Sequence, residues 1–230
     1  MDKNLFITGT SKGLGYAVTR EFVSRGWKVY CIIKDKKDIE TMKNIDKDNV
    51  FPIVSDVTKE TVKKDIEKVL NKNIKIDLLI NNAGEAEKPL PFLQSDIEGI
   101  KRNLDIHCIG AARVTQAVLD QMEENSSIIN ISSRFGSVKK IASGELDHIP
   151  CSYSYKIAKG AQTMFTQCLS RELKDTNIKV CSLHPGKLKT ALAAPDADHE
   201  PEEAAAEIFK IKDKIENGKF YSLFEGEFEV

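Results

Sequence analysis

Seven short apolar runs, most of them separated by segments with helical patterning, constrain the fold of this chain more than any other feature. They cover residues 5–8, 28–33, 50–54, 77–81, 126–132, 179–184 and 220–224. The run at 126–132 is apolar through its middle rather than alternating, which is typical of a strand covered on both faces. Strands that alternate with helices form parallel sheets. The sequence therefore predicts an α/β fold of the Rossmann type, with a doubly wound, mainly parallel seven-stranded sheet and helices on both faces.

Length and composition set the size of this unit and the kind of partner it can have. The chain has 230 residues, 41% of them hydrophobic, and no linker or low-complexity tract divides it. We therefore expect one domain spanning residues 1–230. A net charge of −1 provides no electrostatic footprint for nucleic acid or an anionic membrane surface. The expected partner is a small molecule.

The apolar runs and the cysteines bear on location and on metal binding. No run approaches the ~20 apolar residues of a spanning helix, so the sequence favours a cytoplasmic protein without a membrane contact. The five cysteines are scattered and form no C-x-x-C pair. This pattern predicts reduced thiols rather than a disulfide framework, and no metal site.

A glycine-rich turn follows the first predicted strand directly. Gly9, Gly13 and Gly15 lie between that strand and an amphipathic helix, with the spacing G-x-x-x-G-x-G rather than G-x-G-x-x-G. Such a turn lets the backbone approach a pyrophosphate, and the free N–H groups of the helix N-terminus suit the negative charge. Turn formation alone is the alternative. The strand and helix on either side favour a dinucleotide cofactor.

Two lysines bear on which dinucleotide is bound. Lys12 lies in the glycine turn, and Lys34 follows the second strand, where an NAD-selective site usually has an acid. Lysines there attract a 2′-phosphate, so NADP(H) is favoured over NAD(H). Asp35 weighs against this interpretation, and both lysines could be ordinary surface residues.

Five motifs occur in one order along the chain: TGTSKGLG at 8–15, NNAG at 81–84, ISS at 131–133, YKIAK at 155–159 and HPGKLKT at 184–190. In order and spacing they resemble the short-chain dehydrogenase/reductase family of single-domain type, over essentially the whole chain. The C-terminal part is similar to the carbonyl-reductase-like branch that includes sniffer and C-factor proteins. The resemblance implies an NADP(H)-dependent oxidoreductase that reduces a ketone or aldehyde.

Three side chains are the expected catalytic groups. Tyr155 and Lys159 are four residues apart on a helix predicted at 154–173, so they share a face, and the ammonium would lower the pKa of the phenol. The resemblance implies that Tyr155 is the acid/base and that Lys159 also holds the nicotinamide ribose. It selects Ser133 over Ser132 to orient the carbonyl, because Gly136 follows three residues later. A serine that only caps a turn is the alternative.

The resemblance also assigns cofactor contacts. Asp56 would meet the adenine, although it could equally be a cap or turn residue before a helix at Thr58. The full expected set consists of Gly9, Ser11, Lys12, Gly13, Leu14, Gly15, Lys34, Asp56, Val57, Asn82, Ala83, Gly84, Tyr155, Lys159, Pro185, Gly186 and Thr190.

Departures from the family pattern occur at three places. His107, not Asn103, takes the position of the usual proton-relay asparagine, so His107 is either a catalytic residue or a structural histidine between helix and sheet. The polar segment 137–152 before Tyr155 is long, and it is either part of the substrate rim or a surface insertion. The segment 191–201 is either a mobile loop or a solvated connection, and its shortness suggests an open site tolerant of varied carbonyl compounds.

Two further possibilities complete these expectations. A protein that binds NADP(H) as a regulator or scaffold is the alternative to the reductase, although such a protein has no evident need for all three catalytic side chains. An epimerase of the related extended family fits the length and glycine spacing poorly. By resemblance, a homodimer or homotetramer would assemble through helices at 110–123 and 155–173.

Overall fold

The computed structural model describes residues 3–190 and 196–230, and its centre is one mainly parallel sheet. The strand order is β3-β2-β1-β4-β5-β6-β7-β8, and only β8 runs antiparallel to its neighbour. The predicted fold class is confirmed, with one strand more than expected. The strands are β1 Asn4–Thr8, β2 Lys28–Ile33, β3 Val50–Val54, β4 Ile76–Asn81, β5 Met122–Ile131, β6 Lys179–His184, β7 Phe220–Ser222 and β8 Gly226–Phe228.

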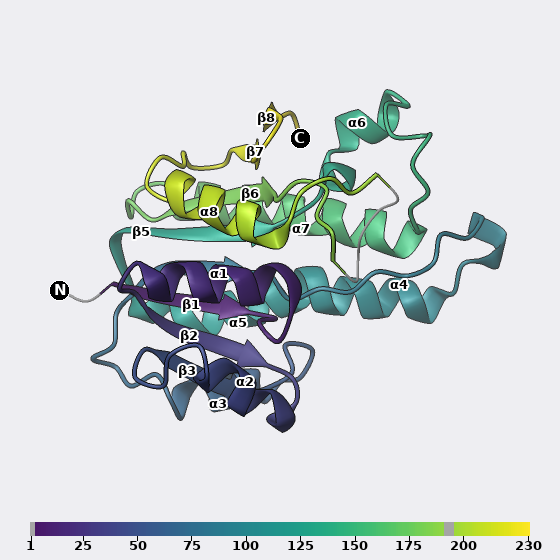
Figure 1. Cartoon of the computed structure of the whole chain (residues 1–230). Helices are drawn as coiled ribbons and strands as arrows, with labels where there is room; N and C mark the ends of the chain where they lie inside the picture. The colour runs from purple at the N-terminus through teal and green to yellow at the C-terminus, as the bar shows by residue number, and fades with distance from the viewer. Residues whose placement is uncertain (1–2, 191–195) are drawn as a thin grey trace.

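Helices cover both faces of this sheet, as the alternating pattern predicts (Figure 1). They are α1 Gly13–Ser24, α2 Ile39–Lys43, α3 Val62–Glu67, α4 Ile97–Leu104, α5 Gly110–Val118, α6 Val138–Ala142, α7 Tyr153–Glu172 and α8 Pro201–Ile211. A π-helical turn, Asp105–Ile109, joins α4 to α5. A capping box between Glu200 and Glu203 starts α8, with Pro201 at its first turn.

The two faces of the sheet bury separate hydrophobic cores. On one face, Phe22 of α1 and Ile208 of α8 pack with strand residues such as Ile7. On the other, Val114 of α5 and Leu169 of α7 pack against the opposite side of the same strands. Alternate residues of a strand point to opposite faces, so a strand buried on both sides must be apolar at nearly every position. The uninterrupted apolar runs of the sequence follow from this arrangement.

Some boundaries differ from those expected. The helix predicted at 110–123 ends at Val118, because β5 already begins at Met122. The helix expected at Thr58 begins only at Val62, after a turn.

The strand order reverses direction between β1 and β4, and this positions the site. Parallel sheets open a crevice beyond the carboxyl ends of the strands at such a switch point. The glycine turn follows β1, the NNAG motif follows β4, and Ser133 lies just beyond β5. The topology therefore brings segments far apart in the sequence to one edge of the sheet.

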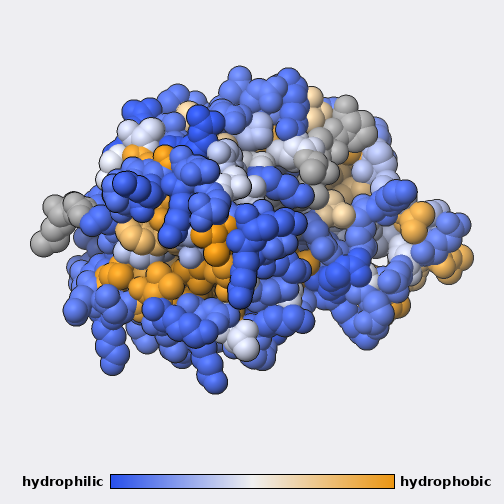
Figure 2. Space-filling view, turned by 60° about the horizontal axis from the view of Figure 1, so that its bottom comes forward, coloured by the Kyte–Doolittle hydropathy of each residue, from blue (hydrophilic) through white to orange (hydrophobic). Residues whose placement is uncertain are grey.

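A projection beside the sheet carries exposed apolar side chains, seen as small orange areas at the right of Figure 2. It is formed by the loop before α4, where Leu90, Phe92 and Leu93 are exposed. Phe92 contacts Tyr153 at the start of α7, with ring centroids 5.3 Å apart.

Within the described ranges, the structure contains no helix long and apolar enough to cross a membrane. All five cysteines have free thiols.

Candidate active site

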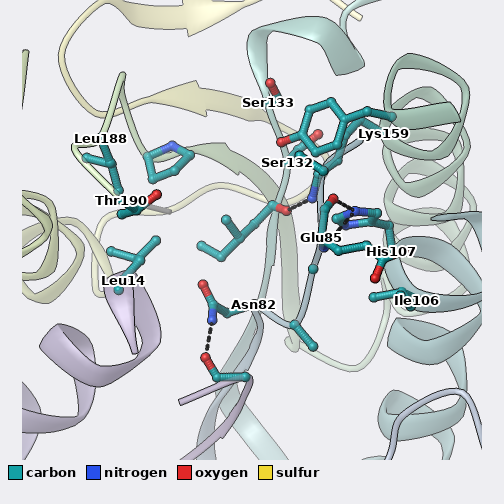
Figure 3. A pocket seen from close by; sticks show the side chains of 18 of the residues that line it. Leu14, Asn82, Glu85, Ile106, His107, Ser132, Ser133, Lys159, Leu188 and Thr190 are labelled. Atoms are coloured by element: carbon teal, nitrogen blue, oxygen red, sulfur yellow. Dashed lines mark hydrogen bonds between the residues drawn. The ribbon is translucent and has the colours of Figure 1, made fainter. Parts of the chain in front are cut away.

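A cavity of about 940 Å³ lies at the carboxyl edge of the sheet. It is lined by every residue that the sequence analysis assigned to the site except Gly15. Figure 3 shows Leu14, Leu188 and Thr190 on one side of this pocket, Ile106 and His107 on the other, and Asn82 between them. The predicted site residues thus come together in one place, although they derive from eight separate segments of the chain.

The glycine turn has a backbone that side chains would obstruct. Gly9 and Gly13 have φ angles of 72° and 58°, in the left-handed region that glycine adopts without strain. A Cβ on Gly15 would lie 2.7 Å from Asn82 Nδ2 and still closer to the Gly9 carbonyl oxygen. Gly15 thus supports the turn from behind rather than lining the cavity. The resulting cradle at the N-terminus of α1 fits a pyrophosphate.

Asn82 connects this turn to the end of β4. Its side-chain Nδ2 donates to the carbonyl oxygens of Thr8 at 2.9 Å and Gly9 at 3.0 Å. The backbone N–H groups of Asn82 and Ala83 both donate to the Thr8 hydroxyl. The NNAG motif therefore holds the glycine turn in position, and Thr8 is a supporting residue that the motif comparison did not select.

At the adenosine end of the cavity, Lys34 and Asp56 form an ion pair with Nζ 3.0 Å from Oδ2. Asp56 also accepts hydrogen bonds from the backbone and hydroxyl of Thr58, so it is a turn residue as well as a lining residue. These bonds and Lys34 outweigh burial and lower the pKa of Asp56. Asp35 accepts a hydrogen bond from the Lys37 backbone, pairs with the Lys37 ammonium and is not among the described lining residues.

The two serines after β5 have different surroundings. The Ser132 hydroxyl is buried and lies 3.2 Å from the Thr163 hydroxyl. Both serines line the cavity, and the Ser133 Oγ accepts from the Phe135 backbone at 3.3 Å, which caps a short 3-10 turn. Ser133 is therefore a capping serine, and its role in orienting a carbonyl stays a prediction.

Tyr155 is buried, and this dominates its acidity. Burial raises its pKa to about 12, although the nearby Ser133 hydroxyl and the Arg134 charge act in the opposite direction. The expectation that Lys159 lowers the pKa of Tyr155 stays a prediction.

Lys159 lies deep in the same site. Its ammonium group donates to the Ile131 carbonyl oxygen at 2.6 Å and to Gln162 Oε1 at 3.0 Å, and it lies 5.7 Å from the centroid of the Tyr155 ring. Burial lowers the pKa of Lys159 to about 7. The four-residue spacing does bring the two side chains together, but by ring contact rather than by a hydrogen bond.

His107 lies in the π-helical turn, and a π-turn inside a helix frequently marks a functional site. Its ring meets that of Tyr155 edge-on at 5.4 Å, and its Nε2 lies 2.8 Å from the Glu85 carbonyl oxygen. A Cβ on Gly84 would lie 2.5 Å from this ring. Burial and the charge of Lys159 keep the pKa of His107 well below 6.5. The histidine is therefore neutral and packs against Gly84, Glu85 and Tyr155, and whether its role is catalytic or structural stays open.

The long segment before Tyr155 contributes to the site mainly through its end. Pro150, Cys151 and Ser152 line the cavity. Leu146 and Ile149 instead form a small cluster with Phe135. The segment is therefore partly rim and partly a support.

The structure adds lining residues that the sequence analysis did not select. Arg134 and Phe135 follow Ser133 directly, and His184 begins the HPGKLKT motif, so proximity to the chosen motifs was the available signal. Burial lowers the pKa of His184 to about 3.

No group of three or more potential metal ligands occurs within residues 3–190 and 196–230.

The segment predicted to be mobile, 191–201, falls in part outside the described residues, at 191–195. Its remainder is held by polar contacts. Asp196 pairs with Arg134, and the backbone of Asp198 and His199 donates to the Lys187 carbonyl oxygen. From Asp196 onward the segment is therefore a fixed connection to α8.

Comparison with known solved structures agrees with the fold. The carbonyl reductase Sniffer of D. melanogaster superposes with a TM-score of 0.88 at 21% identity, over all of both chains. A carbonyl reductase from chicken fatty liver, solved with NADPH bound, superposes with a TM-score of 0.88 at 22% identity, over 100% of this chain and 99% of that one.

Sequence comparison finds related proteins in addition to the structures of similar fold. An uncharacterised oxidoreductase of Staphylococcus saprophyticus is 31% identical over 84% of this chain and 81% of its own length. One of Saccharomyces cerevisiae is 32% identical over 80% of this chain, but the match spans only 59% of that protein. The profile of the short chain dehydrogenase family matches residues 3–201. The chain therefore belongs to the short-chain dehydrogenase family of oxidoreductases.

Proposed function

We propose that this protein is an NADP(H)-dependent reductase of ketones or aldehydes. The observation that carries the proposal is the convergence of Ser133, Tyr155 and Lys159 on the cavity that also contains the glycine turn. A protein that only binds the cofactor has no use for these three side chains together. The NADPH-bound carbonyl reductase of similar fold supports the same function.

The cavity suits a dinucleotide along its whole length. The cradle at Gly9 and Gly13 would hold the pyrophosphate, and Asp56 and Val57 would meet the adenine end. Lys12 and Lys34 line the cavity and would attract a 2′-phosphate, which supports NADP(H) over NAD(H). Ser11, Leu14, Ala83, Gly84, Pro185, Gly186 and Thr190 would complete the cofactor contacts.

The reaction follows from the protonation states of the site. A bound reduced nicotinamide supplies a hydride to the carbonyl carbon. Tyr155, with its pKa raised to about 12, is protonated at neutral pH and donates its phenol proton to the carbonyl oxygen. The high pKa also makes the resulting phenolate recover a proton from water readily. The protonated phenol is the form of Tyr155 that carbonyl reduction requires.

The neighbouring side chains orient the reacting groups. The Ser133 hydroxyl would donate to the carbonyl oxygen and stabilise the charge that develops there. Lys159, which lines the cavity, would hold the nicotinamide ribose through its ammonium, and the Ile131 carbonyl and Gln162 fix the position of that ammonium. His107 would position Tyr155 through its edge-on ring contact.

The remaining expectations stay proposals. All described strands belong to one sheet, which supports a single domain. Exposed Ile157 and Met164 on α7 support assembly through that helix, so a homodimer or homotetramer is proposed. A cytoplasmic location stays a prediction from the sequence.

Loss of NADPH absorbance with a panel of aldehydes and ketones tests the reductase. We expect turnover by the wild type, and a decrease of about 10²- to 10⁴-fold in Tyr155→Phe, because general acid catalysis contributes on this order. NADPH binding, followed by its fluorescence, should persist in the variant, and NADH serves as the comparison for cofactor preference. NADPH binding without turnover of any panel member would favour the scaffold protein. Unchanged turnover by Tyr155→Phe would mean that Tyr155 is not the acid/base.

A further inference from the structure

A buried cation lies next to Ser133 in the wall of the cavity. The side chain of Arg134 is only 10% exposed, and its guanidinium binds Asp196 through three hydrogen bonds of 2.9–3.0 Å. A second cation, Lys187, also lines the cavity. Its Nζ lies 2.6 Å from Asp198 and 4.0 Å from Asp196.

The two sides of this charge cluster face different surroundings. Arg134 and Lys187 line the cavity, whereas Asp196 and Asp198 are absent from its described lining. The bonds to Asp196 use Nη1 and Nη2 of Arg134, and no described residue accepts the Nε–H. Both cations therefore line the cavity while their carboxylate partners do not, and Arg134 keeps one donor that its ion pair does not use.

The charge of Arg134 acts on the catalytic end of the cavity. Arg134 lowers the pKa values of Tyr155 and His184, which shows that its charge is felt at both groups. Of the four described acids that line the cavity, Glu85 and Glu87 pair with Arg102 at the base of the projection, Asp56 pairs with Lys34, and Glu202 lies at the start of α8. Near Ser133 the described lining therefore offers two cations beside the neutral, buried His184, whose ring nitrogens have no hydrogen-bond partner among the described residues.

We propose that the carbonyl substrate carries a carboxylate, which binds Arg134 and Lys187 while the carbonyl oxygen lies at Ser133 and Tyr155. This inference rests on the proposed reductase function and names its substrate class. A guanidinium matches the planar, two-oxygen shape of a carboxylate, and a buried site strengthens the attraction. Arg134 is then a specificity-determining residue rather than a structural one.

Pairs of aldehydes that differ only in charge test the proposal. We would measure kcat/KM with NADPH for meta- and para-carboxybenzaldehyde, each against the carboxamide of the same shape. At least one carboxylate should be preferred by about 10- to 100-fold, as expected for a charge-assisted hydrogen bond in a buried site. The proposal is overturned if neither carboxylate is preferred.

Substitutions test which side chains produce the preference for the carboxylate. Arg134→Gln should abolish this preference while the carboxamide is still turned over. Arg134→Lys should keep part of the preference. Lys187→Gln should also reduce the preference for the carboxylate. Because the Lys187 side chain is 27% exposed, this variant tests the proposal even if the Arg134 variants fold poorly. Lys139→Gln is the matched control, because Lys139 pairs with Glu229 away from the cavity. An equal preference in Arg134→Gln, Lys187→Gln and Lys139→Gln would assign the effect elsewhere and refute the proposal.

The two proposals fail in different ways. If the wild type turns over the carboxamides without preferring the carboxylates, the reductase function stands and the carboxylate subsite is wrong. If it turns over neither these compounds nor any other member of the aldehyde and ketone panel, and NADPH still binds, the reductase function itself is wrong.

Discussion

Gly15→Ala tests whether close backbone packing behind the glycine turn is needed for both stability and cofactor binding. A Cβ at this position would overlap the Gly9 carbonyl oxygen and lie 2.7 Å from Asn82 Nδ2. Forcing an extra carbon into a packed site costs about 1–3 kcal/mol. Losing the two Asn82 hydrogen bonds to Thr8 and Gly9 costs roughly 1 kcal/mol each. Alanine in a helix returns about 1 kcal/mol relative to glycine. We therefore expect the free energy of unfolding to fall by about 2–4 kcal/mol.

Gly160→Ala is the matched control for this substitution. Gly160 also lies in a helix, α7, but a Cβ there would have no neighbour within 4 Å. The same chemical change should therefore stabilise the protein by up to about 1 kcal/mol.

Urea unfolding can be followed through Trp27, the only tryptophan, whose ring lies 5.2 Å from that of Phe22 on α1. NADPH binding should weaken in Gly15→Ala and not in Gly160→Ala. The reasoning is refuted if Gly15→Ala is as stable as the wild type within about 0.5 kcal/mol, the range of ordinary surface changes, and binds NADPH equally well.

Two further predictions concern the buried titratable groups. The pKa of Lys159 is about 7 in the folded protein against an ordinary value of 10.5, so between these pH values the unfolded chain binds the proton and the folded chain does not. Relative to Lys159→Met, the wild type should gain up to about 1.4 kcal/mol of stability per pH unit above pH 7, measured by urea unfolding at pH 7 and pH 9, and a constant difference would contradict this. His107→Phe keeps a ring against Tyr155 but loses the bond to Glu85, so kcat should fall about tenfold. Because His107 is already neutral, the shape of the kcat–pH profile above pH 5 should not change, and loss of a titration near pH 6.5 would show that His107 ionises during turnover.

The parallel architecture and the identity of the main site residues were predictable from the sequence, since both depend on local signals. Buried strands must be apolar on both faces, and their runs match the observed β2, β3 and β6 exactly in extent. Gly9, Ser133 and Tyr155 lie in short motifs at strand ends or on a helix, and strand order brings them to one cavity. The helix expected at 110–123 ended early because tertiary pairing of β5 outweighed local helical propensity.

Tertiary structure alone decided the electrostatics and the charge pattern of the cavity. Spacing places Lys159 beside Tyr155, but burial, which no sequence pattern reports, raises the pKa of the phenol and lowers that of the ammonium. In the same way, Arg134 and Asp196 are 62 positions apart, and only the fold places Arg134 in the cavity wall and pairs it with Asp196. The sequence determined which groups are available for the reaction. The folded chain determined their charge and which of them face the substrate, because desolvation and long-range pairing depend on the whole surroundings of a side chain.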